Sequence, residues 1–388
     1  MTKPLKIAMV AGETSGDMLG ALLLGGLQQR WPQVQAMGIG GLQMQKKGFT
    51  AWWPSDKLAV RGYVEVLRHY REIVGIRKQL LARLLQDPPD VFIGIDAPDF
   101  NLGLETQLKA KGVKTVHFIS PSIWAWRPER IEKMHAACDH VLCIFPFEKP
   151  LYDQAGIAAT YVGHPLAKVI PIQPDRLAAR QALGLQPDDT VVAILPGSRQ
   201  SEVKYIAHRL FKAADHISIA QAAIKFVVPA IPALRAQIEA VAAQVGVLGK
   251  LQIVNGQSHT VLAACDVTMI ASGTATLEAA LFKRPMVIAY DMHWLSWWMM
   301  RRKKLQPWVG LPNILCQDFV VPELIQEAAT PQALAQATLD WLPLNGTASE
   351  KPAKIRALEQ RFTDLHHSLL RDTPTLACDA IQTVLSRA

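Results

Sequence analysis

The sequence has little that would tie it to export, to a structural metal or to a membrane span. Its 388 residues include only five cysteines, scattered and without a Cys-x-x-Cys pair, so neither a disulfide framework nor a zinc site is indicated. No stretch free of Asp, Glu, Lys and Arg exceeds 15 residues, whereas a spanning helix needs about 20 apolar residues. The chain also reaches Glu13 before an apolar signal-peptide core is complete. We therefore expect a cytoplasmic protein that does not cross a membrane.

The composition is that of a folded protein with a basic excess. Hydrophobic residues make up 50% of the chain and charged residues 19%, which excludes disorder. The 41 Lys and Arg against 33 Asp and Glu give a net charge of +8, suited to a nucleic acid, a membrane surface or a small anionic substrate. The sequence offers neither a basic helix nor an aromatic RNA-binding motif, so no nucleic-acid partner is expected.

Short apolar runs alternate with helical stretches, a pattern typical of parallel sheets covered by helices. A cluster of helix breakers at residues 163–174 separates two such series. The strands predicted in them cover residues 7–10, 34–37, 91–95, 115–119 and 141–144, then 191–195, 225–228, 251–254, 267–270 and 285–289. The fold class is α/β, with two doubly wound, Rossmann-like domains at residues 1–165 and 166–320 facing a cleft. Residues 321–388 are predicted as C-terminal helices that pack back across the domains, at 323–327, 331–342, 351–370 and 375–386.

The first predicted strand ends in Gly-Glu-Thr-Ser-Gly-Asp and leads into a helix, so its backbone N–H groups could face an anion or a sugar. An NAD site is disfavoured, because the spacing is not Gly-x-Gly-x-x-Gly and residues 18–55 hold no ribose-binding acid. Ordinary helix capping accounts for the serine but not for both glycines. The candidate substrate-binding residues of this loop are Gly12, Glu13, Ser15 and Gly16.

Two further loops follow strands of the first domain. Asp96 comes directly after residues 91–95 and is the candidate general base, although a simple turn with Asp99 as a helix cap would also fit. The next strand ends in Ser-Pro-Ser-Ile-Trp-Ala-Trp, where Ser120 and Trp124 could line a pocket or Trp124 could be packing. Asp99, Ser120 and Trp124 are kept as candidate substrate contacts.

In the second domain, the sequences of two loops indicate a binding site for a nucleotide diphosphate. Leu-Pro-Gly-Ser-Arg follows a strand, and its arginine can pair bidentately with a pyrophosphate; no Walker lysine is present. Ala-Ser-Gly-Thr-Ala-Thr-Leu-Glu again joins a strand to a helix, although an N-capped helix explains it equally well alone. The candidate residues are Gly197, Ser198, Arg199, Glu202, Ser272, Gly273, Thr274 and Glu278.

A tryptophan-rich segment is followed at once by four cations. Its aromatic residues could be buried, or they could dock at a bilayer interface where cations meet anionic lipids. The residues expected at a membrane surface are Trp294, Trp297, Trp298, Arg301 and Arg302.

Taken together and in this order, seven motifs resemble the lipid A disaccharide synthase family. They are Gly-Glu-Thr-Ser-Gly-Asp, Asp-Ala-Pro-Asp-Phe-Asn, Ser-Pro-Ser-Ile-Trp-Ala-Trp, Gly-His-Pro, Leu-Pro-Gly-Ser-Arg-x-x-Glu-Val, Ser-Gly-Thr-Ala-Thr-Leu-Glu and Leu-Pro-Asn, between about residues 7 and 315. Their joint occurrence is far more specific than any one of them.

The resemblance implies an inverting GT-B glycosyltransferase on the cytoplasmic face of the inner membrane. Its reaction joins UDP-2,3-diacylglucosamine to 2,3-diacylglucosamine 1-phosphate, giving the β-1,6 lipid A disaccharide 1-phosphate and UDP. It assigns Asp96 as the base or as the group that orients the acceptor, the second-domain loops to UDP, and Asn313 to the UDP site on resemblance alone. No cofactor is implied, and the absence of Asp-x-Asp gives a metal-bridged diphosphate no support. A homodimer stays open.

Two alternatives remain at this level. Another GT-B transferase or a UDP-sugar 2-epimerase would have much the same nucleotide half. A basic protein that binds nucleotide without chemistry would also suit the net charge.

Overall fold

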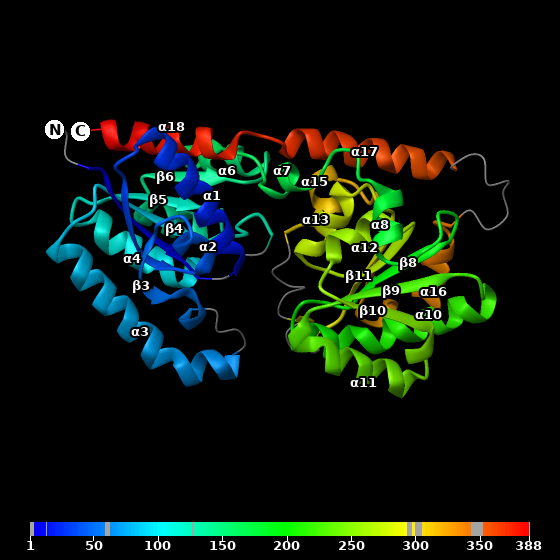
Figure 1. Cartoon of the computed structure of the whole chain (residues 1–388). Coiled ribbons are helices and arrows are strands. Elements are labelled where there is room, and N and C mark those ends of the chain that lie inside the picture. The colour runs from blue at the N-terminus through cyan, green and yellow to red at the C-terminus, as the bar shows by residue number, and fades with distance from the viewer. Residues whose placement is uncertain are drawn as a thin grey trace. The chain divides into compact units, whose positions relative to one another are not determined.

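The computed structural model describes residues 4–12, 14–58, 63–125, 128–292, 297–298, 305–342 and 352–387. It has two compact units: unit 1 comprises residues 1–165 and 369–388, and unit 2 comprises residues 166–368 (Figure 1). The chain therefore passes between the units twice. The expected C-terminal segment, 321–388, is shared between them, since it enters unit 2 first and ends in unit 1.

Unit 1 is built on a seven-stranded parallel sheet in the order β3-β2-β1-β4-β5-β6-β7. Its central strands are continuous apolar runs buried on both faces, as in β4, because helices cover the sheet on each side. The strands are β1 (Lys6–Ala11), β2 (Gln35–Gly40), β3 (Thr50–Pro54), β4 (Val91–Ile95), β5 (Lys114–Phe118), β6 (His140–Cys143) and β7 (Ala159–Tyr161).

The helices of unit 1 are α1 (Thr14–Arg30), α2 (Leu42–Gln45), α3 (Tyr63–Gln86), α4 (Pro98–Lys109), α5 (Arg130–Ala137), α6 (Glu148–Gln154) and α18 (Thr373–Ser386). One core cluster joins β4 to α3 and α4 through Phe92, Leu80 and Leu104. The last helix, α18, packs on α1, where Arg30 donates to Gln382 Oε1 at 2.5 Å. Unit 1 is thus completed by a segment that is distant in sequence.

Unit 2 is built on a six-stranded parallel sheet in the order β10-β9-β8-β11-β12-β13. Its strands are β8 (Val191–Leu195), β9 (Lys225–Ala230), β10 (Leu251–Asn255), β11 (Val267–Ala271), β12 (Met286–Tyr290) and β13 (Glu323–Ile325). Its helices are α7 (Leu166–Val169), α8 (Arg176–Ala182), α9 (Gln200–Glu202), α10 (His208–Ala220), α11 (Arg235–Val245), α12 (Ser258–Ala264), α13 (Thr274–Leu281), α15 (Leu311–Cys316), α16 (Pro331–Leu339) and α17 (Ala353–Leu369).

Each sheet reverses its strand order at one place, between β1 and β4 in unit 1 and between β8 and β11 in unit 2. At such a switch point the connections leave toward opposite faces and open a crevice outside the carboxyl ends of the strands, where α/β proteins bind ligands. The four loops that follow β1, β4, β8 and β11 are therefore the positions to search for a site.

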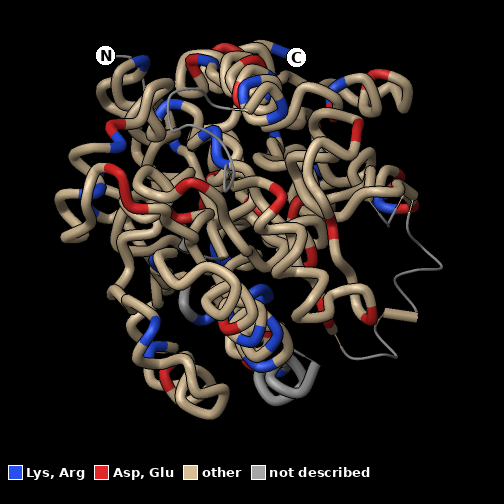
Figure 2. The backbone as a smooth tube through the Cα atoms, turned by 90° about the vertical axis from the view of Figure 1, so that its right-hand side faces the viewer, with Lys and Arg blue, Asp and Glu red and all other residues tan. Residues whose placement is uncertain are grey.

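The predicted α/β class with two doubly wound domains is confirmed. The sequence reading missed β3 and β7. Within the helix predicted at residues 323–327 it was wrong at Glu323–Ile325, which pairs with β12 as strand β13, and a short 3₁₀ helix follows at Gln326–Ala328. No helix among the described residues is long and apolar enough to span a membrane. Figure 2 shows basic and acidic positions interspersed along the described chain.

Candidate active site

The switch point of unit 2 carries a cavity of about 350 Å³, within the usual range for small-molecule sites. It brings together eight of the nine residues expected to bind UDP, from the loops after β8 and β11 and from the helices that follow them. The lining includes Gly197, Ser198, Arg199, Glu202, Ser272, Gly273, Thr274 and Glu278. The cavity therefore joins two loops that lie more than 70 residues apart in sequence.

The loop after β8 is shaped around Gly197, whose φ is +121°. A methyl group at this position would lie 2.7 Å from Glu202 Oε2, so only glycine fits. The Glu202 carboxylate accepts from the Ser198 N–H at 2.7 Å and pairs with Arg199 at 3.0 Å. The helix that follows contains a π-helical stretch, Val203–Ala207, a feature common at functional sites. The Ser198 N–H is thus engaged by Glu202, whereas the Arg199 guanidinium keeps further N–H groups from which a diphosphate oxygen can accept.

The loop after β11 presents a second set of polar groups. Gly273 precedes α13, and its carbonyl accepts from Thr276 Oγ1 at 2.7 Å, which orders the first turn. Further along α13, Glu278 lies 3.3 Å from His259 Nε2 of α12. His259 was not predicted from the sequence, because a lone histidine carries no motif. A half-buried carboxylate at this position can accept hydrogen bonds from sugar hydroxyls.

Asn313 does not line this cavity. Its buried side chain at the start of α15 donates to Val321 O at 2.9 Å and to Glu323 Oε1 at 2.8 Å, and it accepts from the Val321 N–H at 3.0 Å. The Glu323 carboxylate also accepts from the N–H groups of Val309 and Gly310. The structure places Asn313 in a loop-fastening network, so its assignment to UDP rests on resemblance alone.

At the switch point of unit 1, the turn after β4 presents Asp96 in a strained backbone. Asp96 has a φ of 53° and Ala97 a φ of 46°, a left-handed pair that costs on the order of 1 kcal/mol per residue. Phe118 O accepts from the Asp96 N–H at 3.0 Å, and Asn101 Nδ2 donates to Asp96 O at 2.8 Å. Among the described residues the half-buried Asp96 carboxylate has no hydrogen-bond partner. Non-glycine strain of this kind is concentrated at functional sites.

The loop after β1 packs directly against that turn. A methyl group at Gly12 would lie 2.8 Å from Ala97 Cβ, so Gly12 allows the close approach, and Gly16 packs near Ala11 and Ile95. Ser15 is exposed, and Glu13 lies outside the described residues. Asp17 has a structural role, since its carboxylate accepts from three backbone N–H groups around α2.

Ser120 and Trp124 come together in a polar cluster that includes two residues missed by sequence reasoning. Trp124 Nε1 donates to Glu148 Oε1 at 3.1 Å, and Ser120 Oγ lies 2.7 Å from Tyr152 Oη. Glu148 Oε2 also accepts from the N–H groups of Ile144 and Phe145. Burial raises the pKa of Glu148 to about 7, against the opposing effect of these hydrogen bonds. Glu148, a carboxylic acid that ionises near neutral pH, therefore lies at the carboxyl edge of this sheet.

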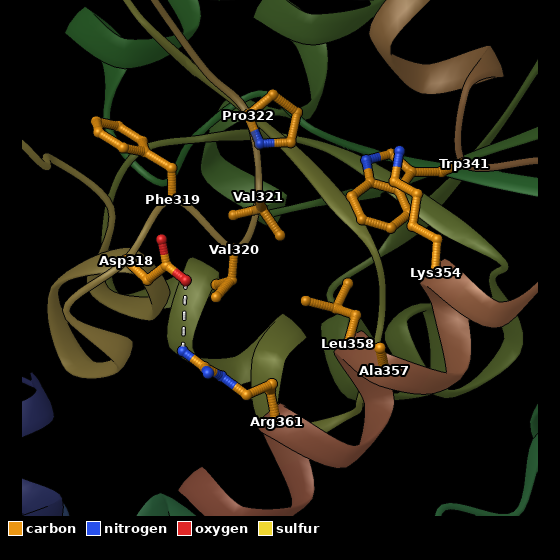
Figure 3. A pocket seen from close by; sticks show the side chains of 10 residues that line it. All are labelled: Asp318, Phe319, Val320, Val321, Pro322, Trp341, Lys354, Ala357, Leu358 and Arg361. Carbon is orange, nitrogen blue, oxygen red and sulfur yellow. Dashed lines mark ion pairs between the residues drawn. The ribbon is translucent and has the colours of Figure 1, made fainter.

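Two other hollows lie outside the switch points. Asp99, exposed and paired with Arg130 at 2.6 Å, lines a hollow of about 450 Å³ between α4 and α5. A groove of about 530 Å³ in unit 2 runs between residues 318–322 and α17 (Figure 3). Its cations are already engaged, since Arg361 faces Asp318 at 3.6 Å and Lys354 stacks 3.8 Å from the Trp341 ring. Neither hollow has the converging donors of the switch-point cavity.

Comparison with known sequences finds one family over nearly the whole chain. Residues 7–381 match the family model described as lipid-A-disaccharide synthetase. The lipid-A-disaccharide synthase of Albidiferax ferrireducens is 68% identical over 386 residues, which cover 99% of this chain and 98% of that protein. That of Verminephrobacter eiseniae is 62% identical over 387 residues, covering 100% and 99%. That of Paraburkholderia xenovorans is 50% identical over 386 residues, covering 99% and 97%.

Comparison with solved structures finds the same architecture at low identity. UDP-GlcNAc 2-epimerase from Neisseria meningitidis bound to UDP-GlcNAc aligns with a TM-score of 0.64 at 11% identity, covering 99% of this chain and 100% of that chain. A calicheamicin glycosyltransferase aligns with a TM-score of 0.63 at 13% identity, covering 100% and 99%. Because epimerases and transferases share this fold, the fold alone does not choose between them.

Proposed function

Because the chain belongs to the lipid-A-disaccharide synthetase family, we propose that its two units divide one glycosyl transfer between them. The protein is a UDP-sugar glycosyltransferase of lipid A disaccharide synthesis. In the proposal, unit 2 binds the donor through its switch-point cavity and unit 1 activates the acceptor through Asp96. The donor is UDP-2,3-diacylglucosamine, and the acceptor is 2,3-diacylglucosamine 1-phosphate.

The chemistry follows from the charges that develop during transfer. The acceptor hydroxyl oxygen attacks the anomeric carbon of the donor, its proton passes to the Asp96 carboxylate, and the anomeric C–O bond to the diphosphate breaks. Negative charge then grows on the departing UDP. Arg199 and the donors of the Ser272–Thr274 loop stabilise that charge, because they are in place before the reaction. Glu278 accepts hydrogen bonds from the ribose hydroxyls.

The observation that carries the assignment of Asp96 is its strained turn. Asp96 and Ala97 hold left-handed backbone at the switch point of unit 1, and the Asp96 carboxylate has no competing partner among the described residues. A base must be presented to its substrate without an internal hydrogen bond that holds it in another orientation.

The test is UDP release by the purified protein in detergent, with the donor alone and with donor plus acceptor. We expect release only when the acceptor is present, together with a disaccharide 1-phosphate in the mass spectrum. UDP release without acceptor, or an epimerised UDP-sugar, would favour the epimerase alternative. Binding of UDP with no turnover under any condition would favour a binding protein.

We also propose peripheral attachment to the inner-membrane surface. Of the predicted residues, Trp297 and Trp298 are described, and Trp298 is 46% exposed; Trp294, Arg301 and Arg302 lie outside the described residues. Leu305 and Phe319, nearby in sequence, are 54% and 59% exposed. Sedimentation with anionic and with neutral vesicles tests the attachment, and light scattering tests for the homodimer.

A further inference from the structure

A buried polar cluster in unit 1 has no part in the proposed chemistry. Glu105 of α4 and His117 of β5 are fully buried, and His117 Nδ1 lies 2.9 Å from Glu105 Oε1 and 3.2 Å from Oε2. The thiol of Cys138 lies 3.6 Å from Glu105 Oε2. A buried carboxylate is costly unless it is paired, so a pair that the core retains is a candidate for positioning something else.

The pair lies directly on the strand that leads to Asp96. Gly94 of β4 is opposite His117 of β5 in the sheet register. A methyl group at Gly94 would collide with Glu105 Oε1 and would lie 3.0 Å from Asn101 Cβ. The absence of a side chain at Gly94 therefore lets α4 rest on the sheet through its polar groups.

The same face of α4 reaches the strained turn. Asn101 lies one helical turn before Glu105, and both side chains are fully buried. Asn101 Nδ2 donates to Asp96 O at 2.8 Å and lies 3.4 Å from Val10 O of β1. Asn101, Glu105 and His117, which we call the polar clamp, thus connect α4 to three adjacent strands, β1, β4 and β5.

We infer that Glu105 and His117 are positioning residues for Asp96. Since α4 begins only two residues after Asp96, the placement of α4 decides where the carboxylate points. A strained left-handed pair such as Asp96 and Ala97 persists only where surrounding contacts hold its backbone in place. The polar clamp provides such contacts, directly through the hydrogen bond from Asn101 to Asp96 O and indirectly by holding α4 on the sheet. The inference rests on the proposed role of Asp96.

A metal site is the competing reading of the same side chains. Glu105, His117 and Cys138 offer three ligand atoms within 4.8 Å of one another, the one such group among the described residues. A structural zinc site takes four protein ligands, whereas this buried group offers three. The direct His117–Glu105 contact also uses the imidazole nitrogen nearest the carboxylate. The chemistry therefore favours a clamp.

The test is a double-mutant cycle of Glu105→Ala and Asp96→Asn, read as kcat and as KM for the donor. We expect Glu105→Ala to lower kcat by about 10- to 100-fold, the effect of misplacing a catalytic group by about 1 Å, and to leave KM within twofold. In the Asp96→Asn background, Glu105→Ala should lower kcat no further, because no base remains for it to misplace. Glu105→Gln, whose amide oxygen still accepts from His117 Nδ1–H, should recover most of the activity.

Leu108→Ala on the same helix is the control, because it loosens α4 in the apolar core without touching the clamp. A drop in kcat that persists in the Asp96→Asn background would overturn the inference, as would an equal drop in Leu108→Ala at matched loss of Tm. So would one equivalent of tightly held zinc that Glu105→Gln releases. Gly94→Ala, which displaces the carboxylate but removes no polar group, replaces Glu105→Ala should that variant not fold. Full turnover by Asp96→Asn alone would refute the proposed base instead.

Discussion

The two switch points have the same topology but opposite local character. The loops of unit 2 combine glycine, backbone N–H groups, hydroxyls and a cation around an open cavity. The turn of unit 1 holds one carboxylate on a strained backbone, with buried polar side chains beneath it. Under the proposed function, this difference lets one crevice hold negative charge and the other orient a single proton acceptor.

The largest effect should come from removing the proposed base, Asp96. Asp96→Asn keeps the shape of the turn but cannot take up a proton, so we expect kcat to fall by about 10²- to 10⁴-fold. The Kd for UDP, measured by calorimetry, should stay within twofold because the proposed donor cavity lies in unit 2. Weakened UDP binding by Asp96→Asn would contradict the proposal that donor binding belongs to unit 2 and base catalysis to unit 1.

The next effect concerns the free energy of unfolding and its dependence on pH, which we expect Glu148 of unit 1 to control. Burial raises the pKa of Glu148 to about 7 from an ordinary 4.5. Between these values the folded protein keeps a proton that the unfolded chain releases, so the free energy of unfolding falls as pH rises through this window and levels off above pH 7. The fall amounts to at most about 3 kcal/mol. In Glu148→Gln, which cannot ionise, this dependence should disappear.

Urea unfolding of both proteins at pH 4.5, 6 and 7.5 measures that difference. The half-buried His164, whose pKa is lowered by desolvation to about 4, has the opposite effect, since its contribution to stability is lost as pH falls from 6.5 to 4. It is present in both proteins and cancels in their difference. Glu327→Gln, at an exposed position in unit 2, should leave the pH dependence unchanged. Parallel curves for wild type and Glu148→Gln would refute the assignment.

The third effect concerns Arg199, the cationic side chain of the unit 2 cavity. Arg199→Ala should weaken UDP binding by about 10- to 100-fold, because a charge-assisted and bidentate contact is lost. Arg199→Lys should recover only part of the affinity, since it keeps the charge but not the fork. Arg235→Ala, which breaks a surface pair with Glu239 in the same unit, is the matched control. Equal losses in the two alanine variants would mean that general charge, not Arg199, attracts the nucleotide.

The smallest effects compare one glycine from each crevice. Gly197→Ala strains a positive-φ position beside Glu202 and should weaken UDP binding by about 5- to 10-fold. Gly12→Ala pushes on Ala97 and should lower kcat by a similar factor with little change in UDP affinity. Gly249→Ala, with nothing within 4 Å of the added methyl group, should change neither. If Gly12→Ala altered UDP binding and not kcat, the assignment of unit 1 would be wrong.

The sequence predicted what local patterns determine. Apolar runs located ten strands to within a few residues. The loops after those strands gave the candidate site, because parallel strands end at one edge of a sheet. Glu323–Ile325 was mispredicted as helix because Glu-Leu-Ile has no strong preference of its own, and pairing with β12 makes it a strand.

The polar clamp and Glu148 could not be predicted for a related reason. Their partners lie 12 and 24 residues away, so no motif joins Glu105 to His117 or Glu148 to Trp124. Only the register of the sheet and the packing of α4 and α6 bring these side chains together.

The double passage of the chain between the units has a consequence for synthesis. Unit 2 is one continuous segment, but unit 1 needs residues 369–388, which follow the whole of residues 166–368. At about 5 to 20 residues per second, translation of those 203 residues takes roughly 10 to 40 seconds. Throughout that interval the face of α1 that receives α18 is uncovered on the nascent chain. The N-terminal unit is thus the first to be synthesised and the last to be completed.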